Sequence, residues 1–198
     1  MLPPTHVAYT LVTLSEIQNN SDYFEDADYR LVALAALGPD LLDKPLSWAY
    51  FHRKYRSGRF FAHTLIVHLA VLLYTLWKAP HKLVYALAFN GHAVADRMWF
   101  YKKTWYWPMK GWSFSGRRNG NEKPLGILLS YWYAVTQLRR LFDWDVGGIV
   151  ALLWFIARNR LWERKRFMHL VRTGRLLDVE QGASRSKEVA DVVKKTVL

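Results

Sequence analysis

The run from Phe60 to Trp77 constrains the fold most, because its eighteen residues contain no Asp, Glu, Lys or Arg. A run of this length predicts a helix that either just spans a bilayer or lies buried in a helical core. Shorter apolar runs cover 31–42, 83–95, 125–138 and 146–157, and their lengths suit buried helices or interfacial segments about as well as membrane spans. Basic residues flank almost every run and therefore predict no single orientation in a membrane. We predict an all-α, membrane-associated bundle of about six helices.

The composition predicts an anionic partner and limits the metal ligands. The chain has a net charge of +12, and 16% of its residues are aromatic, which suits a membrane surface or a nucleic acid. It contains no cysteine, so any metal would be held by His, Asp and Glu, which favours zinc, manganese or iron. Its 198 residues suit one domain, predicted at 1–175, with a polar tail at 176–198. The first residues show no signal-peptide pattern.

The N-terminal segment predicts a helix that places a histidine beside the core. Pro3 and Pro4 precede Thr5, a residue type that often caps helices, and the helix is predicted to run to about Gln18. His6 recurs with apolar residues at helical spacing. We therefore expect His6 on or beside the buried face.

A Gly-Pro pair predicts a sharp corner after a second helix, which is expected over 30–37. Gly38 and Pro39 end that helix, and Asp40 follows them on the turn. A carboxylate at a rigid corner could ligate a metal, or it could only cap the next turn. The sequence leaves both interpretations of Asp40 open.

His92 and Asp96 lie four residues apart in a stretch that is predicted to be helical from Leu83 to Phe100. Residues at this spacing share one helix face, with Cβ atoms roughly 6 Å apart. An ionised carboxylate in an apolar helix is costly unless it is paired or coordinates a metal. The pair is therefore a candidate metal site, and a buried His–Asp hydrogen bond is the alternative.

Two more histidines lie in the 60–77 run, and two further candidates precede it. His63 and His68 are five residues apart, about 140° around a helix axis, so they should not share one ion. His63 lies near the helix start and is the ligand candidate, whereas His68 is predicted to make a hydrogen bond in the core or between helices. The basic connector contains His52, another candidate ligand, and Arg53, which could bind a phosphate or anionic headgroup.

An aromatic and basic stretch covers 99–114. Its Trp, Tyr and Lys residues suit the headgroup region of a membrane, and such a stretch could also form a lid over a site. The same composition suits stacking of single-stranded nucleic acid. The neighbouring apolar helices favour lipid over nucleic acid as the partner.

Two helices are predicted in the C-terminal part of the chain. One begins at Pro124 and runs to about Phe142. The other begins near Val146, turns basic from Arg158 and ends at Gly174. Its basic half could lie on an anionic surface, or it could be a solvated face.

The candidate residues form an ordered set of short motifs. These are His6, Gly-Pro-Asp at 38–40, His-Arg at 52–53, His-Thr-Leu at 63–65 and His-x-x-x-Asp at 92–96, before an aromatic-rich segment and Pro108. Over roughly the first 110 residues, this order resembles the YdjM-type inner-membrane metal-dependent hydrolases, which are also described as LexA-binding. It is more distantly similar to the all-helical zinc-dependent phospholipase C family.

The resemblance implies a metal centre and a hydrolytic reaction. Asp40, His63, His92 and Asp96 would hold one ion, and His6 would join Asp96 at a second. The ions would be zinc, with manganese or iron as alternatives, and would activate a water molecule. Asp40 would be a ligand or a general base that orients this water.

We therefore predict a metal-dependent hydrolase that acts on a phosphoester, which could derive from a lipid. Asp40, His52 and Arg53 are the candidate catalytic residues, and a membrane lipid or an anionic small molecule is the expected partner. Two other functions fit the sequence. One is a non-enzymatic membrane or protein-interaction protein with structural His–Asp pairs, and the other is a nucleic-acid binder that uses its basic and aromatic residues.

Overall fold

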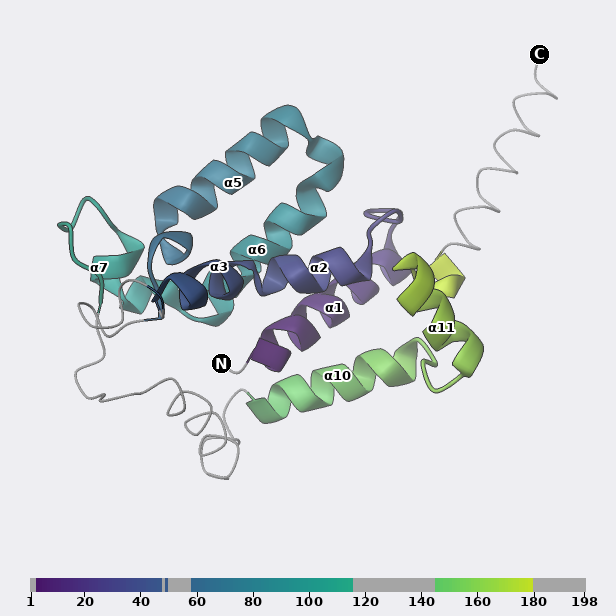
Figure 1. The fold of residues 1–198 in the computed structure, drawn as a ribbon. Coiled ribbons are helices and arrows are strands. Elements are labelled where there is room, and N and C mark those ends of the chain that lie inside the picture. The colour runs from purple at the N-terminus through teal and green to yellow at the C-terminus, as the bar shows by residue number, and fades with distance from the viewer. Residues whose placement is uncertain (1–2, 48, 50–57, 116–144, 180–198) are drawn as a thin grey trace, which may run out of the picture.

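Every regular element that the structure describes is helical, which confirms the predicted all-α class over these residues (Figure 1). The computed structural model describes residues 3–47, 49, 58–115 and 145–179. Its α-helices are α1 (Pro3–Asn20), α2 (Tyr29–Ala36), α3 (Gly38–Leu46), α5 (Leu65–Lys78), α6 (Leu83–Ala95), α7 (Lys102–Trp105), α10 (Val146–Arg158) and α11 (Arg164–Thr173). Short 3₁₀ helices are η2 (Phe61–His63), η3 (Pro80–Lys82) and η4 (Met98–Phe100).

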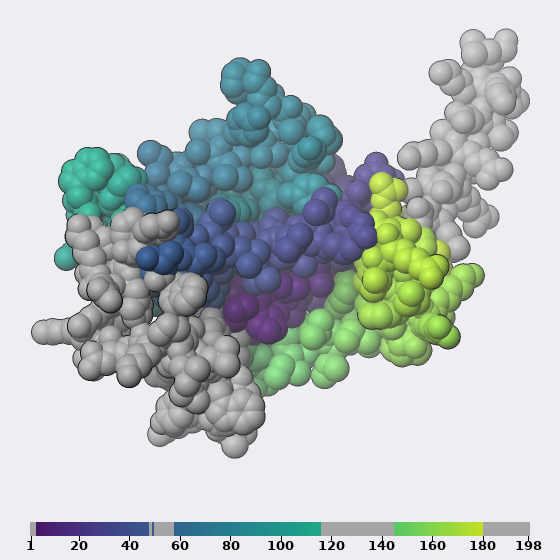
Figure 2. Space-filling model, viewed as in Figure 1, coloured from purple at the N-terminus to yellow at the C-terminus, as the bar shows by residue number. Residues whose placement is uncertain are grey.

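Helix α1 lies at the centre of the packing. It contacts α10 on one side and α2 and α6 on the other, and α5 folds back along α6 after η3 (Figure 1). The main core cluster includes Leu14, Val32, Val84 and Phe155, which come from α1, α2, α6 and α10. In the space-filling view, α5 lies at the top, α10 at the bottom and α11 at the right-hand side (Figure 2).

Helix α11 is held against the start of α2. The Tyr29 N–H donates to Gly174 O over 2.7 Å. The Arg30 guanidinium donates to the carbonyls of Val171 and Arg172 over 3.1 and 3.0 Å. Gly174 has a φ of 74°, the left-handed conformation that glycine adopts most easily, and its predicted position at the helix end is confirmed.

The predicted N-cap at Thr5 is wrong, because α1 begins at Pro3. Proline fits the first turn of a helix, where its missing N–H leaves no bond unmade. Thr5 is instead buried within the helix, and its hydroxyl donates to the Asp145 carboxylate over 2.8 Å. This bond ties the start of α1 to the residue that precedes α10. His6 is buried, as predicted.

The 60–77 run is not the single helix that was predicted. Residues 61–63 form η2, and Thr64 has extended backbone before α5 begins at Leu65. The Thr64 hydroxyl accepts the Val67 N–H over 3.4 Å and so caps α5. Among the helices of the described residues, none is both long enough and apolar enough to cross a membrane.

Two other helices end earlier than predicted. Helix α6 stops at Ala95, and Arg97 then takes left-handed backbone with a φ of 51°. The final helix divides into α10 and α11, and Arg160 between them has a φ of 49°. The predicted helix over 124–142, most of the connector at 52–59 and the tail beyond 179 lie outside the described residues.

Candidate metal centre

Three histidines and three carboxylates gather where α1, α3, η2 and α6 meet. They are His6 from α1, Asp40 and Asp43 from α3, His63 from η2, and His92 and Asp96 from α6 and its C-cap. The structure thus brings together all five predicted ligands and adds Asp43. The two other candidate site residues, His52 and Arg53, lie outside the described residues.

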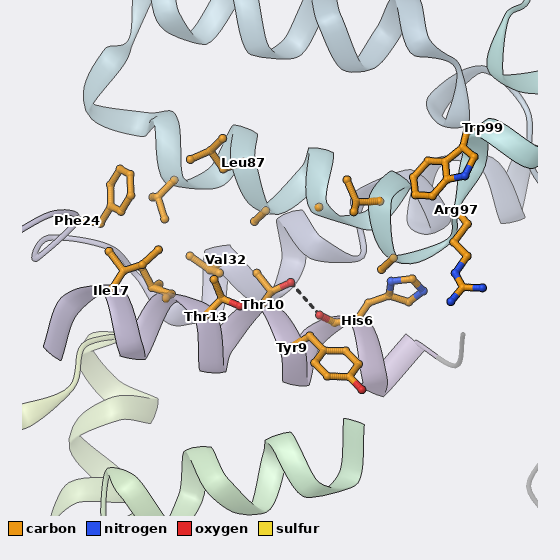
Figure 3. Close-up of a pocket in the computed structure, with 16 residues that line it drawn as sticks. His6, Tyr9, Thr10, Thr13, Ile17, Phe24, Val32, Leu87, Arg97 and Trp99 are labelled. Atoms are coloured by element: carbon orange, nitrogen blue, oxygen red, sulfur yellow. Dashed lines mark hydrogen bonds between the residues drawn. The ribbon is translucent and has the colours of Figure 1, made fainter. Parts of the chain in front are cut away.

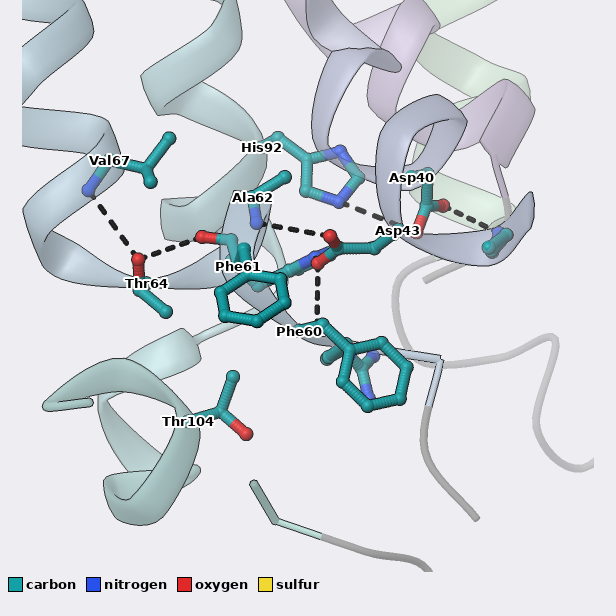
Figure 4. A network of polar contacts seen from close by, with 12 residues as sticks. Asp40, Asp43, Phe60, Phe61, Ala62, Thr64, Val67, His92 and Thr104 are labelled. Atoms are coloured by element: carbon teal, nitrogen blue, oxygen red, sulfur yellow. Dashed lines mark hydrogen bonds and ion pairs between the residues drawn. The ribbon is translucent and has the colours of Figure 1, made fainter. Parts of the chain in front are cut away.

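Asp40, His63 and His92 form the trio best placed to hold a cation. Asp40 Oδ1 lies 3.6 Å from His63 Nε2 and 3.9 Å from His92 Nε2 (Figure 4). Ligand atoms about 2.0–2.1 Å from a tetrahedral zinc ion lie roughly 3.4 Å apart, so both Asp40 distances are close to ligand spacing. All three atoms lie within 4.8 Å of one another. Lys44 Nζ binds the other Asp40 oxygen over 2.6 Å and leaves Oδ1 facing the two rings.

Within this trio, the His92 ring presents an unprotonated nitrogen to Asp40 and His63. Its Nδ1 donates to Ala36 O over 2.8 Å, because a carbonyl oxygen can only accept. Burial, together with the neighbouring His6, lowers the pKa of His92 from 6.5 to about 4, so the ring is neutral at pH 7. A neutral ring with its proton on Nδ1 has a lone pair on Nε2, which is the form that binds a metal.

Asp43 fixes the His63 ring in the same way. Its carboxylate lies 2.7 Å from His63 Nδ1 and accepts the N–H groups of Phe60 and Ala62 over 2.6 and 3.0 Å (Figure 4). A carboxylate at Nδ1 holds the ring proton there and leaves Nε2 as the ligand atom. Asp43 was not predicted as a site residue. Its signal in the sequence is the three-residue spacing from Asp40, which places both carboxylates on one face of α3.

A second trio consists of His6, His92 and Asp96, and it shares His92 with the first trio. The His6 and His92 rings stack with centroids 4.2 Å apart, and His6 Nε2 lies 3.2 Å from Asp96 Oδ1. Arg59 binds Asp96 Oδ2 over 2.7 Å. Burial would raise the pKa of Asp96, but the His6 hydrogen bond and the Arg59 charge outweigh it and hold that pKa well below its usual range. Asp96 is therefore ionised, with a partner on each oxygen.

The comparison with known families agrees with this set of motifs. The family model for the YdjM inner membrane protein matches residues 1–163. The chain belongs to this family. Its description as an inner membrane protein confirms the predicted location, and it names no reaction. No curated protein and no solved structure matches this YdjM-family chain, so the resemblance to phospholipase C gains no support.

His68 lies apart from both trios, in agreement with its spacing from His63. Its ring packs against Phe89 and Trp105, with centroids 5.0 and 5.5 Å away. Neither ring nitrogen has a hydrogen-bond partner of good geometry within the described part of the chain, although a weaker interaction with the Asn90 side chain raises the pKa of the ring slightly. Burial, with a smaller contribution from the nearby His63, lowers the pKa of His68 from 6.5 to about 4.

We predict that acid destabilises this YdjM-family fold through His68. Between pH 6.5 and about 4, the unfolded chain binds a proton that the folded His68 does not. The free energy of unfolding should therefore decrease as the pH falls through this range, by up to roughly 3 kcal/mol from this residue. Chemical denaturation should show a weaker pH dependence for His68→Phe, which keeps a ring against Phe89 and Trp105. An unchanged dependence would contradict this assignment.

The aromatic stretch after α6 packs against the segment that carries His63. Trp107 and Phe114 stack with centroids 5.7 Å apart, and both meet Phe61 edge-on at 5.2 and 5.1 Å. Phe60 also meets Phe114 edge-on at 5.2 Å. Each such pair stabilises a fold by about 0.5–1.5 kcal/mol beyond its buried area. These rings therefore support η2, while the interfacial and lid roles of the stretch stay predictions.

Proposed function

We propose that this chain is a metal-dependent hydrolase of phosphoesters that holds a divalent cation at Asp40, His63 and His92. One observation carries the proposal: His63 Nε2 and His92 Nε2 are buried without hydrogen-bond partners among the described residues, and both lie near Asp40 Oδ1. Leaving a buried polar atom unpaired costs about 1–3 kcal/mol. A cation bound by both nitrogens and by Asp40 would remove this cost at His63 and His92.

The donor set favours zinc, with manganese and iron as alternatives, because it combines two imidazoles with one carboxylate. Three protein ligands also leave a fourth position for water or substrate, as catalytic zinc sites do. A bound cation would supply a Lewis acid for the phosphoryl oxygen and would lower the pKa of a water molecule. Asp43 and the Ala36 carbonyl would keep the two rings in the ligating tautomer.

The geometry favours one ion rather than two. His92 Nδ1 is engaged by Ala36 O, so only Nε2 can bind a metal. Both trios include His92, and a single imidazole nitrogen binds one ion at a time. Both Asp96 oxygens also have partners, His6 and Arg59. The trio of Asp40, His63 and His92 is therefore the better site.

His6, which stacks on the His92 ring, would carry the proton in this reaction. Asp96 holds the proton on His6 Nε2, and His6 Nδ1 is then an unprotonated, buried nitrogen with no partner in the described part of the chain. It could take a proton from the attacking water as the P–O bond forms. It could then return the proton to the alcohol oxygen as the ester P–O bond breaks.

Replacing Asp40 tests this function directly. In Asp40→Asn the ligand loses its charge while its size is kept, so kcat/KM for metal-loaded protein on p-nitrophenyl phosphate or its diester should fall at least about a hundredfold. The matched control is Asp26→Asn, because Asp26 is an exposed carboxylate paired with Arg175. The control should keep full turnover. Full metal-dependent turnover by Asp40→Asn would remove Asp40 from the proposed site.

A further inference from the structure

An apolar groove between α1 and α6 begins at His6, on one side of the candidate metal centre. His6, Arg97 and Trp99 lie at one end, and Ile17 and Phe24 lie at the other (Figure 3). The cavity has a volume of about 590 Å³. It is therefore large enough for a small molecule and is continuous with the His6 side of the cluster.

The middle of the groove is lined almost entirely by carbon. Leu87 and Val94 on α6 stay 45% and 63% exposed along it, although both are aliphatic. Thr10 is one of its few polar residues, and its hydroxyl already donates to His6 O (Figure 3). A Cβ atom added at Gly91 would meet nothing within 4 Å, so the missing side chain keeps this wall open. The groove therefore suits an apolar ligand.

The charged groups lie at one end only. Arg97 is at the His6 end of the groove, and Arg59 binds Asp96 beside His6. An elongated ligand with an anionic head and an apolar chain would match both parts of the groove. Trp99, whose ring has an apolar body and a polar N–H, lies at the same end, where such a head would meet the chain (Figure 3).

We propose that the groove binds the alkyl chain of a lipid phosphoester, with the phosphate at the His6 end. The position of the phosphate rests on the proposed hydrolase function. Membership of an inner membrane protein family places the chain where such lipids are present.

The length of the groove limits the length of the alkyl chain that it can hold. From His6 to Ile17, α1 advances about 16 Å at 1.5 Å per residue. An extended alkyl chain advances roughly 1.3 Å per carbon, given bonds of about 1.5 Å. The groove should therefore hold about twelve carbons, and longer chains should gain no further affinity.

The test measures binding of n-alkyl phosphates, from butyl to hexadecyl, to the full chain in nanodiscs. Empty nanodiscs are subtracted, and inorganic phosphate is the probe without a chain. The dissociation constant should fall up to about fourfold for each added methylene and level off near dodecyl phosphate. An affinity that does not depend on chain length would overturn the proposal.

Variants of Gly91 test whether the alkyl chain binds in this groove. Gly91→Trp should fill the groove and weaken dodecyl phosphate binding by at least roughly thirtyfold, with little change for butyl phosphate. Gly91→Ala adds one methyl group and should bind within about twofold of the wild type. Thr13→Trp repeats the block from α1, at an exposed residue that also lines the groove, in case the first variant does not fold. Unchanged dodecyl binding by a folded blocking variant would overturn the proposal.

Other outcomes separate this proposal from its rivals. If Gly91→Trp disrupts a dimer and leaves alkyl binding intact, the groove holds a second copy of the chain and the proposal fails. Alkyl binding is measured on metal-free protein without turnover, so it survives a failure of the hydrolase proposal. Metal-dependent turnover without any chain-length dependence would remove only the role of the groove.

Discussion

Protein purified without a metal-binding tag should carry about one equivalent of zinc, manganese or iron, and His63→Ala and His92→Ala should carry almost none. Each substitution removes one of the two nitrogens that face Asp40 Oδ1 at 3.6 and 3.9 Å. The two remaining ligands cannot hold the ion against water. Elemental analysis of the folded variants measures the effect.

Loss of the ion should abolish the reaction as well. The Lewis acid and the activated water depend on the cation, so kcat/KM should fall by at least about a thousandfold, or roughly 4 kcal/mol in the barrier. Adding excess zinc should restore turnover in the wild type after chelation but not in His63→Ala or His92→Ala. A variant that regains full activity with metal would not have lost a ligand.

His68 provides the matched control for these substitutions. It is as buried as His63 and His92, at 1% exposure against 0% and 1%, and it lies outside both trios. His68→Ala therefore removes the same chemical group from the core without removing a ligand, and its metal content should equal that of the wild type. Equal metal loss in all three variants would show that destabilisation, and not coordination, is being measured. A metal-free wild type, even after incubation with these ions, would remove the basis of the hydrolase proposal.

The sequence predicts which residues meet better than it predicts where the helices end. The four-residue spacing of His92 and Asp96 and the Gly-Pro pair before Asp40 are local patterns, so they could be recognised in the chain alone. Thr64 is a different case, because it interrupts an apolar run that looks continuous. Its local capping bond competes with a longer helix, and aromatic packing on Phe61 favours the break.

The atoms that face each other could not be predicted from the sequence. His92 Nε2 is free because Ala36 O, fifty-six residues earlier, holds the other nitrogen. Similarly, Asp96 is paired on both oxygens only because α1 and Arg59 meet it in the fold. Residue spacing indicates that a carboxylate and an imidazole are near, whereas tautomer and pairing depend on distant backbone. Spacing therefore predicts Asp96 as a metal ligand, and only the fold shows that it is also the partner of His6.

Asp43→Ala should cost more stability than any other single change in the cluster. The carboxylate is fully buried and accepts from Phe60 N, Ala62 N and His63 Nδ1. Alanine would leave all three donors unpaired, so the free energy of unfolding should fall by about 3–5 kcal/mol. Chemical denaturation in the presence of a chelator measures this without a contribution from metal.

Asp43→Asn separates the two roles of this residue. The asparagine oxygen can still accept backbone N–H groups, so the loss of stability should be smaller than in Asp43→Ala. Its amide N–H₂ would instead donate to His63 Nδ1, which moves the ring proton to Nε2 and blocks the ligand atom. Metal affinity, measured by competition with a chelating dye, should fall about 10–100-fold. The control Asp145→Asn changes a carboxylate that accepts from Thr5 and should keep wild-type affinity. If Asp43→Asn also keeps it, Asp43 supports only the fold, and another group sets the tautomer of His63.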